Sequence, residues 1–444
     1  MRDFLPEDVR RREYVIGIIK RVYERYAFEP LETPAVENLE TLLGKYGDEG
    51  NQLIFKILKR GEHEKTGEAD LALRYDLTVP LARVMVEHQA KLPRLFKRYQ
   101  IQPVWRADRP ARGRFREFYQ CDVDSLGSTS PVIEAELCVA VADAMTELGF
   151  NDFVIRINHR QLLTALLEVS GVDVSLHTTV LIVLDKLDKV GPESVRAELI
   201  SRGVRDSVCD SLLKTFPGQG RHLPSFSDGV LQRFFDLLGE NPKALAALRN
   251  LRTIKELVGG TSADKRLTLD VSLARGLSYY TGAIMEINVA DLAGSLGGGG
   301  RYDNLIGMFS GQDIPACGFS LGLERILVVM TERGMFPPTV AASPADVMLA
   351  MFDASAAGDA MRVADVLRAS GLRVLVYPDA DKIGKQIKYA DGRGIPFVAL
   401  LGDDEIKAGT VTVKNLATQT QQAYPQSEAG AAIKALKETL TQRG

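Results

Sequence analysis

The chain has 444 residues, enough for two to four domains with substantial cores. Hydrophobic residues make up 45% and charged residues 25%, which excludes a largely disordered chain. The 55 basic and 58 acidic residues give a net charge of −3, so any nucleic-acid surface must be local. No apolar run reaches about 18 residues, and charges at positions 7–13 replace the apolar stretch of a signal peptide. We therefore expect a cytoplasmic protein without membrane contact.

Four scattered cysteines form no Cys-x-x-Cys pair, and the five histidines form no His-x-x-x-His pair. This spacing excludes a disulfide scaffold and a cysteine-built zinc site, and it suits a reducing compartment. We expect no metal site built from protein side chains alone.

The first half of the chain predicts a mixture of helices and strands. Apolar residues in 7–27 recur at helical spacing (Val15, Ile18, Ile19, Val22 and Tyr26), which predicts an amphipathic helix. Short strands are predicted at 28–31 and 71–74, and a pair at 98–104 and 116–123 surrounds a polar loop. A helix is predicted at 130–148, because Ser130-Pro131 precedes it and Gly149 follows it.

Residues 161–258 alternate helical patterns and turns, which predicts a helical insertion at about 161–260. Strand patterns resume at 266–271 and 282–289. After a linker predicted at 334–345, strands and helices alternate, which predicts a compact α/β domain with a partly parallel sheet. Its strands are expected at 346–352, 373–377 and 396–401, and its helices at 357–370, 383–393 and 427–442.

Gly318-Phe319-Ser320-Leu321-Gly322 matches the nucleophile elbow of α/β-hydrolases. That mechanism needs a histidine after the serine, and all five histidines precede Ser320. We therefore predict a tight strand-to-helix turn here. The sequence also has no P-loop and no dinucleotide-binding glycine fingerprint.

Three other segments each leave two interpretations open. Residues 91–120 hold nine basic and two acidic residues, a local net charge of +7, so they form either a solvated basic loop or an arginine-rich phosphate site. The four glycines at 297–300 form either a flexible turn or a close approach of backbone to ligand. Tyr279 and Tyr280 belong either to a core or to a pocket.

Together these segments resemble the class II aminoacyl-tRNA synthetases, and within them the histidyl-tRNA synthetase family. Thr33-Pro34 resembles part of motif 1, at the dimer interface. The segment similar to motif 2 runs from Trp105-Arg106 through Gly113-Arg114-Phe115-Arg116-Glu117-Phe118-Tyr119-Gln120. The segment similar to motif 3 runs from Gly318 through Glu324-Arg325. Two further segments are similar to the signatures of the histidine-specific family: Arg275-Gly276-Leu277 with Tyr279-Tyr280-Thr281-Gly282, and Gly298-Gly299-Gly300-Arg301-Tyr302-Asp303. Many members carry Asp where this chain has Ser278.

The resemblance implies an α+β fold: an antiparallel-sheet catalytic core in residues 1–335 with the helical insertion, and an α/β anticodon-binding domain in residues 345–444. It implies a homodimer that joins histidine to ATP as histidyl-adenylate and then transfers the histidyl group to the 3′ end of tRNA(His). ATP is expected as its Mg²⁺ complex. The alternative is a non-catalytic relative that senses histidine, such as the regulatory subunit of ATP phosphoribosyltransferase.

The same resemblance assigns residues to the site. Arg106 and Arg275 are expected at the α-phosphate of ATP and Arg325 at the γ-phosphate, which makes these three the catalytic residues. Arg112 and Arg114 are expected at the acceptor end of tRNA. The residues expected to bind histidine are Asp76, Leu77, Thr78 and Gln120 near its amino group, and Asp124, Tyr279, Tyr280 and Tyr302 around its imidazole. For Asp76 and Asp124 a structural salt bridge to an arginine is the alternative.

Overall fold

A computed structural model of the chain describes residues 1–61, 66–184, 187–216, 226–274, 279–338, 340 and 343–441. Within these ranges the chain forms two units with separate cores, Met1–Phe336 and Pro337–Gly444. No helix in the described ranges is long and apolar enough to cross a membrane.

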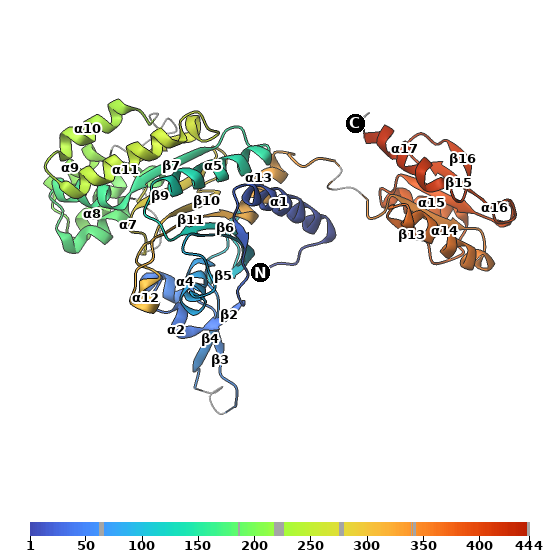
Figure 1. Ribbon diagram of the computed structural model, residues 1–444, viewed down its shortest axis with the longest axis horizontal. Helices are drawn as coiled ribbons and strands as arrows, with labels where there is room; N and C mark the ends of the chain where they lie inside the picture. Colours follow the sequence, from blue (N-terminus) through green and yellow to red (C-terminus); the bar gives the residue numbers. More distant parts are fainter. Residues whose placement is uncertain are drawn as a thin grey trace. The chain divides into compact units, whose positions relative to one another are not determined.

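The first unit is built on an eight-stranded sheet (Figure 1). Its strands, in spatial order, are β1 (Glu29–Pro30), β5 (Phe96–Trp105), β6 (Glu117–Leu126), β11 (Ala316–Gly322), β10 (Gly297–Arg301), β9 (Ala283–Asn288), β7 (Val154–His159) and β8 (Leu267–Leu269). The six central strands are antiparallel, and only the outer pairs β1/β5 and β7/β8 are parallel. The predicted pairing of residues 98–104 with 116–123 is confirmed, because Arg98 lies opposite Asp124 in β5 and β6.

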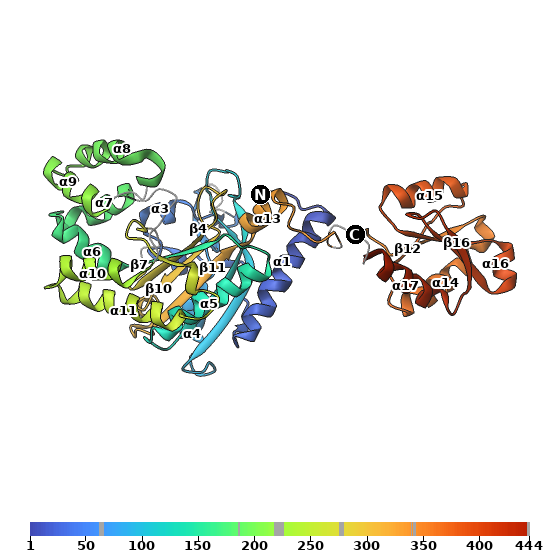
Figure 2. The same ribbon diagram turned by 90° about the horizontal axis from the view of Figure 1, so that it is seen from above.

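Long helices cover one face of this sheet (Figure 2). They are α1 (Pro6–Arg25), α5 (Val132–Glu147), α11 (Pro242–Val258) and α13 (Leu323–Glu332). The predicted first helix is confirmed, but it ends earlier than expected because Ala27 has a left-handed φ of 58°. Tyr23 therefore completes its buried face, whereas Tyr26 lies at the cap and donates its hydroxyl proton to Asp143 Oδ2 at 2.7 Å.

Shorter elements pack against the other face. The helices are α2 (Leu39–Leu42), α3 (Gly47–Gln52), α4 (Thr78–Glu87) and α12 (Gly307–Ser310), and the small antiparallel sheet consists of β2 (Val36–Asn38), β4 (Ala69–Leu73) and β3 (Lys56–Leu58). Leu42, Leu81, Leu305 and Ile306 are buried in the core between them. Tyr279 and Tyr302 belong to the same core.

The predicted helical insertion is confirmed between β7 and β8. It contains α6 (Arg160–Val169), α7 (His177–Leu184), α8 (Leu187–Ser201), α9 (Asp206–Thr215) and α10 (Asp228–Leu238) before α11. Short 3₁₀ helices are η2 (Val174–Leu176) and η3 (Asp264–Arg266) in the first unit and η4 (Ala354–Ala356) in the second.

Two glycine-rich segments form strands. The flexible turn that was one interpretation of Gly297–Gly300 is therefore wrong, whereas a close approach of backbone to a ligand stays a prediction, because Gly297, Gly298 and Gly299 line a cavity. Gly297–Arg301 is neither a turn nor a loop but strand β10, in the interior of the sheet. The glycines are needed for strand packing, since a Cβ on Gly299 would lie 2.1 Å from the carbonyl oxygen of Gly318. The Gly318–Gly322 pentapeptide likewise lies wholly within β11, and helix α13 begins only at Leu323.

The second unit has a five-stranded sheet in the order β13 (Val374–Val376), β12 (Val347–Met351), β14 (Phe397–Leu401), β15 (Thr410–Asn415) and β16 (Gln421–Pro425). The first three strands are parallel and the last two antiparallel. Its helices are α14 (Ala357–Ala369), α15 (Ile383–Gly392), α16 (Asp403–Ala408) and α17 (Ala429–Thr441). Strand β12 is buried on both faces, as expected for a central parallel strand. The predicted α/β alternation is confirmed, whereas β15, β16 and α16 were not predicted.

Candidate active site

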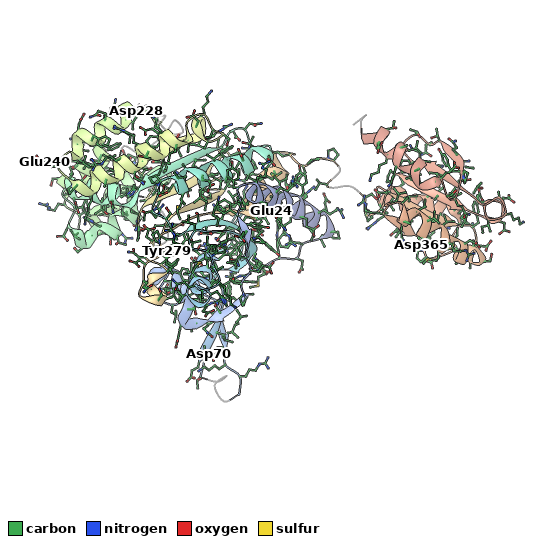
Figure 3. All side chains as sticks on the ribbon, viewed as in Figure 1. Glu24, Asp70, Asp228, Glu240, Tyr279 and Asp365 are labelled. Carbon is green, nitrogen blue, oxygen red and sulfur yellow. The ribbon has the colours of Figure 1, made fainter. Side chains whose placement is uncertain are left out.

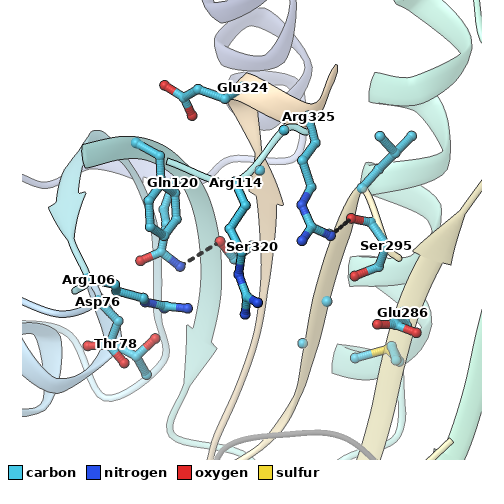
Figure 4. A pocket seen from close by; sticks show the side chains of 18 of the residues that line it. Asp76, Thr78, Arg106, Arg114, Gln120, Glu286, Ser295, Ser320, Glu324 and Arg325 are labelled. Carbon is cyan, nitrogen blue, oxygen red and sulfur yellow. Dashed lines mark hydrogen bonds between the residues drawn. The ribbon is translucent and has the colours of Figure 1, made fainter. Parts of the chain in front are cut away.

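A cavity of about 310 Å³ opens on the large sheet of the first unit. Residues of β6, β9, β10 and β11 line it together with the segments around Asp76, Arg106 and Tyr279. Figure 3 places Tyr279 well inside the unit, whereas Asp70 and Asp228 lie at its margins. Figure 4 shows Asp76, Thr78 and Arg106 along one side of the cavity and Arg325, Ser295 and Glu286 along the other.

Asp76 provides a buried carboxylate at one end of the cavity and is 1% exposed. Its Oδ1 accepts hydrogen bonds from the Tyr46 hydroxyl and the Val79 N–H, both at 3.0 Å. Its Oδ2 accepts one from the Tyr279 hydroxyl at 3.2 Å. Burial raises the pKa of Asp76, and these donors together with Arg106 oppose that rise. A carboxylate held in this way suits a cationic group such as an ammonium.

Arg106 is fixed beside Asp76 by aromatic rings. Its guanidinium lies 4.2 Å from the ring centre of Tyr75 and 5.2 Å from that of Phe118. Its Nε also donates to the Tyr75 carbonyl at 3.0 Å. Stacking and a hydrogen bond together hold a cation in one orientation at the cavity wall.

Two further arginines line the cavity. Arg325, in the first turn of α13, donates from Nη1 to the Ser295 carbonyl at 2.5 Å. Arg114 lies between Arg106 and Arg325 in Figure 4, and its Nε is 3.5 Å from Asp108 Oδ2. Three guanidinium groups therefore surround one cavity, an arrangement suited to a polyphosphate.

Gln120 and Ser320 join β6 to β11 at the cavity floor. The Gln120 side-chain amide donates to Ser320 Oγ at 3.0 Å, while its buried Oε1 has no hydrogen-bond partner among the described residues. Nearby, Glu324 Oε2 accepts from the Tyr119 N–H at 2.9 Å. Burial raises the pKa of Glu324 to about 7.

Asp124 lies on the same face of β6 as Gln120 but four residues farther along, outside the cavity lining. Its Oδ2 is 2.9 Å from Arg98 Nη2, and its Oδ1 accepts from the Tyr302 hydroxyl at 2.5 Å. The salt bridge considered as an alternative for Asp124 is therefore present. Leu77 and Tyr302 are likewise buried outside the lining.

The basic segment 91–120 is not a single solvated loop. Arg98 is fully buried and Lys97 forms an ion pair with Glu136 at 2.8 Å. Arg112 is half-exposed and lies outside the cavity lining, where it pairs with Glu332 and donates to the Asp291 carbonyl at 3.1 Å. The predicted residues that line the cavity are Asp76, Thr78, Arg106, Arg114, Gln120, Tyr279, Tyr280 and Arg325. Arg275 and Ser278 lie outside the described residues.

Comparisons with known proteins identify the family of this chain. The sequence profile described as histidyl-tRNA synthetase matches residues 1–326, and that described as anticodon binding domain matches residues 346–436. This chain belongs to the histidyl-tRNA synthetase family. It is 43% identical to a histidine–tRNA ligase from Gloeobacter violaceus, over 97% of each chain, and 41% identical to one from Flavobacterium johnsoniae, over 95% of each.

Solved structures show the same fold. The crystal structure of histidyl-tRNA synthetase from Nostoc sp. PCC 7120 superposes with a TM-score of 0.80 at 31% identity, covering 98% of this chain and 97% of that one. A Bacillus halodurans structure, described as an ATP phosphoribosyltransferase regulatory subunit/histidyl-tRNA synthetase, has a TM-score of 0.71 at 21% identity and covers 87% of this chain and 94% of its own. That second likeness concerns the fold alone. The predicted family and fold class are confirmed, and the family implies the use of ATP.

Two residues in or next to the cavity were not predicted from the sequence. Glu286 lines the cavity, and its Oε2 lies 3.6 Å from Arg156 Nη1. A carboxylate within the apolar run of β9 is a signal that could have identified it. Tyr46 carries no such signal, because its segment has no periodicity that points to the site. In the described part of the chain no cluster of three or more His, Cys, Asp or Glu side chains could hold a metal.

Proposed function

We propose that this chain activates histidine with ATP to give histidyl-adenylate and then transfers the histidyl group to the 3′ end of tRNA(His). One observation carries the proposal: a single cavity combines a buried carboxylate, Asp76, with arginines on two sides, Arg106 and Arg325. An amino acid and a nucleoside triphosphate need this combination of charges at one site.

The histidine subsite is proposed at the Asp76 end. Asp76, Thr78 and Gln120 would receive the α-ammonium group, and Leu77 would support them through its buried backbone. Tyr279 and Tyr280 would form an aromatic wall for the imidazole. Both line the cavity, and their rings pack edge to face with centroids 5.2 Å apart. Asp124 and Tyr302 would form the wall behind those rings, with Arg98 fixing Asp124.

Adenylation requires a histidine carboxylate oxygen to attack the α-phosphorus and displace pyrophosphate. Arg106 and Arg275 are proposed to hold the α-phosphate and Arg325 the γ-phosphate. Positioned cations of this kind stabilise the charge that develops in the transition state. Mg²⁺ is proposed to enter with ATP as part of the substrate, held through the β- and γ-phosphate oxygens.

The remaining partners follow from the same assignment. We propose residues 1–335 as the catalytic domain and residues 345–444 as the domain that reads the anticodon. Arg112 and Arg114 are proposed to contact the acceptor end of tRNA. We further propose a cytoplasmic homodimer that uses the segment around Thr33-Pro34.

Histidine-dependent exchange of pyrophosphate into ATP, followed by charging of total tRNA, tests the proposal. The intact chain should support both reactions, and Arg275→Ala should lose about 10²–10³ in exchange rate while it remains folded. A histidine-sensing regulatory protein would bind histidine but support neither reaction. Unimpaired exchange in Arg275→Ala would remove that arginine from the proposed site.

A further inference from the structure

Tyr46 contacts two neighbouring parts of one side of the proposed active site. It precedes α3 and is 5% exposed. Its hydroxyl donates to Asp76 Oδ1 at 3.0 Å, and its ring packs against Tyr75 with centroids 4.5 Å apart. One side chain thus contacts both the carboxylate proposed for histidine and the aromatic ring that supports Arg106.

The hydroxyl of Tyr46 acts on the charge of Asp76. Each oxygen of this carboxylate accepts from one phenol, Tyr46 on Oδ1 and Tyr279 on Oδ2. Burial disfavours the ionised form, and hydrogen bonds to it restore its stability. Arg106 also stabilises the anion of Asp76, and the charge of Asp76 in turn raises the pKa of the nearby carboxyls of Asp122 and Asp124.

The ring of Tyr46 acts on Arg106 through Tyr75. Tyr75 is 6% exposed and supports the guanidinium of Arg106 at 4.2 Å, while its carbonyl accepts from Arg106 Nε. Without the Tyr46 ring a void would open beside Tyr75, so the platform under Arg106 would lose its packing.

We propose that Tyr46 is a positioning residue with two separable functions: its hydroxyl orients Asp76 toward the ammonium of histidine, and its ring fixes the Tyr75 platform that aims Arg106 at ATP. This inference rests on the proposed function and adds a residue to it. Tyr46 itself lies outside the cavity lining, so it acts through its two neighbours.

The pair Tyr46→Phe and Tyr46→Leu separates the two functions in pyrophosphate exchange with the full chain. Tyr46→Phe keeps the ring, so we expect the KM for histidine to rise about tenfold or more, as for loss of a hydrogen bond to a charged group, with kcat and the KM for ATP within about twofold of wild type. Tyr46→Leu should add a roughly tenfold or larger loss of kcat. Where Tyr46→Leu fails to fold, Tyr75→Leu replaces it, with the kcat loss expected and the histidine KM retained.

The pH profile provides a readout that a merely structural role would leave unchanged. Asp76 loses a hydrogen-bond donor in Tyr46→Phe, so its pKa should rise. The KM for histidine, which should increase as Asp76 becomes protonated, should therefore begin to increase at a higher pH than in wild type. Tyr26→Phe is the matched control, because it removes a phenol–carboxylate hydrogen bond, to Asp143, away from the cavity. It should leave every kinetic parameter and the profile unchanged.

Unchanged histidine KM and pH profile in Tyr46→Phe would overturn the function of the hydroxyl. Identical kinetics in Tyr46→Phe and Tyr46→Leu would overturn the function of the ring. Failure of the proposed function is distinguishable, since the wild-type chain itself would then show no histidine-dependent exchange. In that case calorimetric titration of histidine into wild type and Tyr46→Phe decides the hydroxyl function, because equal affinities would overturn it.

Discussion

Arg98 and Asp124 form a buried ion pair beside the proposed histidine subsite, with Nη2 and Oδ2 2.9 Å apart. They face each other across β5 and β6, and Asp122 Oδ2 lies 4.0 Å from the same guanidinium nitrogen. Among the described residues, the guanidinium of Arg98 therefore lies near two carboxylates. Burial is the main cause of the raised pKa of Asp122, and the charge of Asp124 adds to it while Arg98 opposes it.

Arg98→Met should destabilise the protein strongly, because it leaves two buried carboxylates without their cation. Breaking a buried pair from one side costs about 3–5 kcal/mol, whereas an apolar replacement of both partners is often neutral. The double variant Arg98→Met/Asp124→Leu should therefore be more stable than Arg98→Met alone. Urea unfolding of the single and double variants measures the coupling. Additive effects would mean that the two side chains are energetically independent.

Glu324 should make stability depend on pH near neutrality. Its pKa is raised to about 7 by burial, against about 4.3 for an unfolded glutamate. Between these values the folded state binds more protons than the unfolded state, so stability falls as pH rises from about 4 to 7. Glu324→Gln lacks this titration, and its thermal midpoint relative to wild type should increase from pH 5 to pH 8. Calorimetry at several pH values measures the difference, and a constant difference would show that Glu324 does not titrate in this range.

Local periodicity accounts for the parts of the fold that the sequence predicts correctly. The buried face of α1 and the alternation of strands and helices in the second unit are each visible within a short stretch of sequence. The family motifs are contiguous segments as well. Family membership and fold class followed from these signals and are confirmed. The roles assigned to single residues stay predictions.

Contacts between distant segments account for what local sequence patterns do not show. Four glycines normally indicate a turn, and only the approach of the Gly318 carbonyl to Gly299 shows why they form a strand. Alternation along β6 places Asp124 on the face of Gln120, but it does not reveal that Tyr302 and Arg98 occupy both of its oxygens. Tyr46 reaches Asp76 across 30 positions of the sequence.

Arg112 and Arg114 should both act in tRNA binding, and only Arg114, which lines the cavity, should also act in adenylation. Changing both to Ala should raise the KM for tRNA. It should also make binding less sensitive to salt, by a slope of about one for each phosphate that is no longer neutralised, because fewer counterions are released. Exchange without tRNA should be little affected for Arg112, which lies outside the cavity lining. If exchange and charging fell together in Arg112→Ala, that arginine would belong to the ATP site.

Glu332 restrains Arg112 in the absence of tRNA, since the two form an exposed ion pair. Solvent screens exposed pairs strongly, so Glu332→Gln should lower the KM for tRNA by no more than about fivefold. Steady-state charging at low salt measures this change. A higher KM in Glu332→Gln would mean that the ion pair holds Arg112 in its binding position.

Removal of residues 337–444 should impair the charging of tRNA much more than histidine-dependent pyrophosphate exchange. The second unit has its own apolar cores on both faces of its sheet, and Asp346 pairs within it with Arg373 at 2.9 Å and Lys437 at 2.8 Å. The cavity residues all belong to the first unit, so residues 1–336 should fold and retain most histidine-dependent exchange. Charging should fall sharply, mainly through the KM for tRNA, because the proposed anticodon contacts are gone. Equal charging by the truncated and full-length chains would refute that assignment, and loss of exchange with retained folding would show that the second unit contributes to the adenylation site.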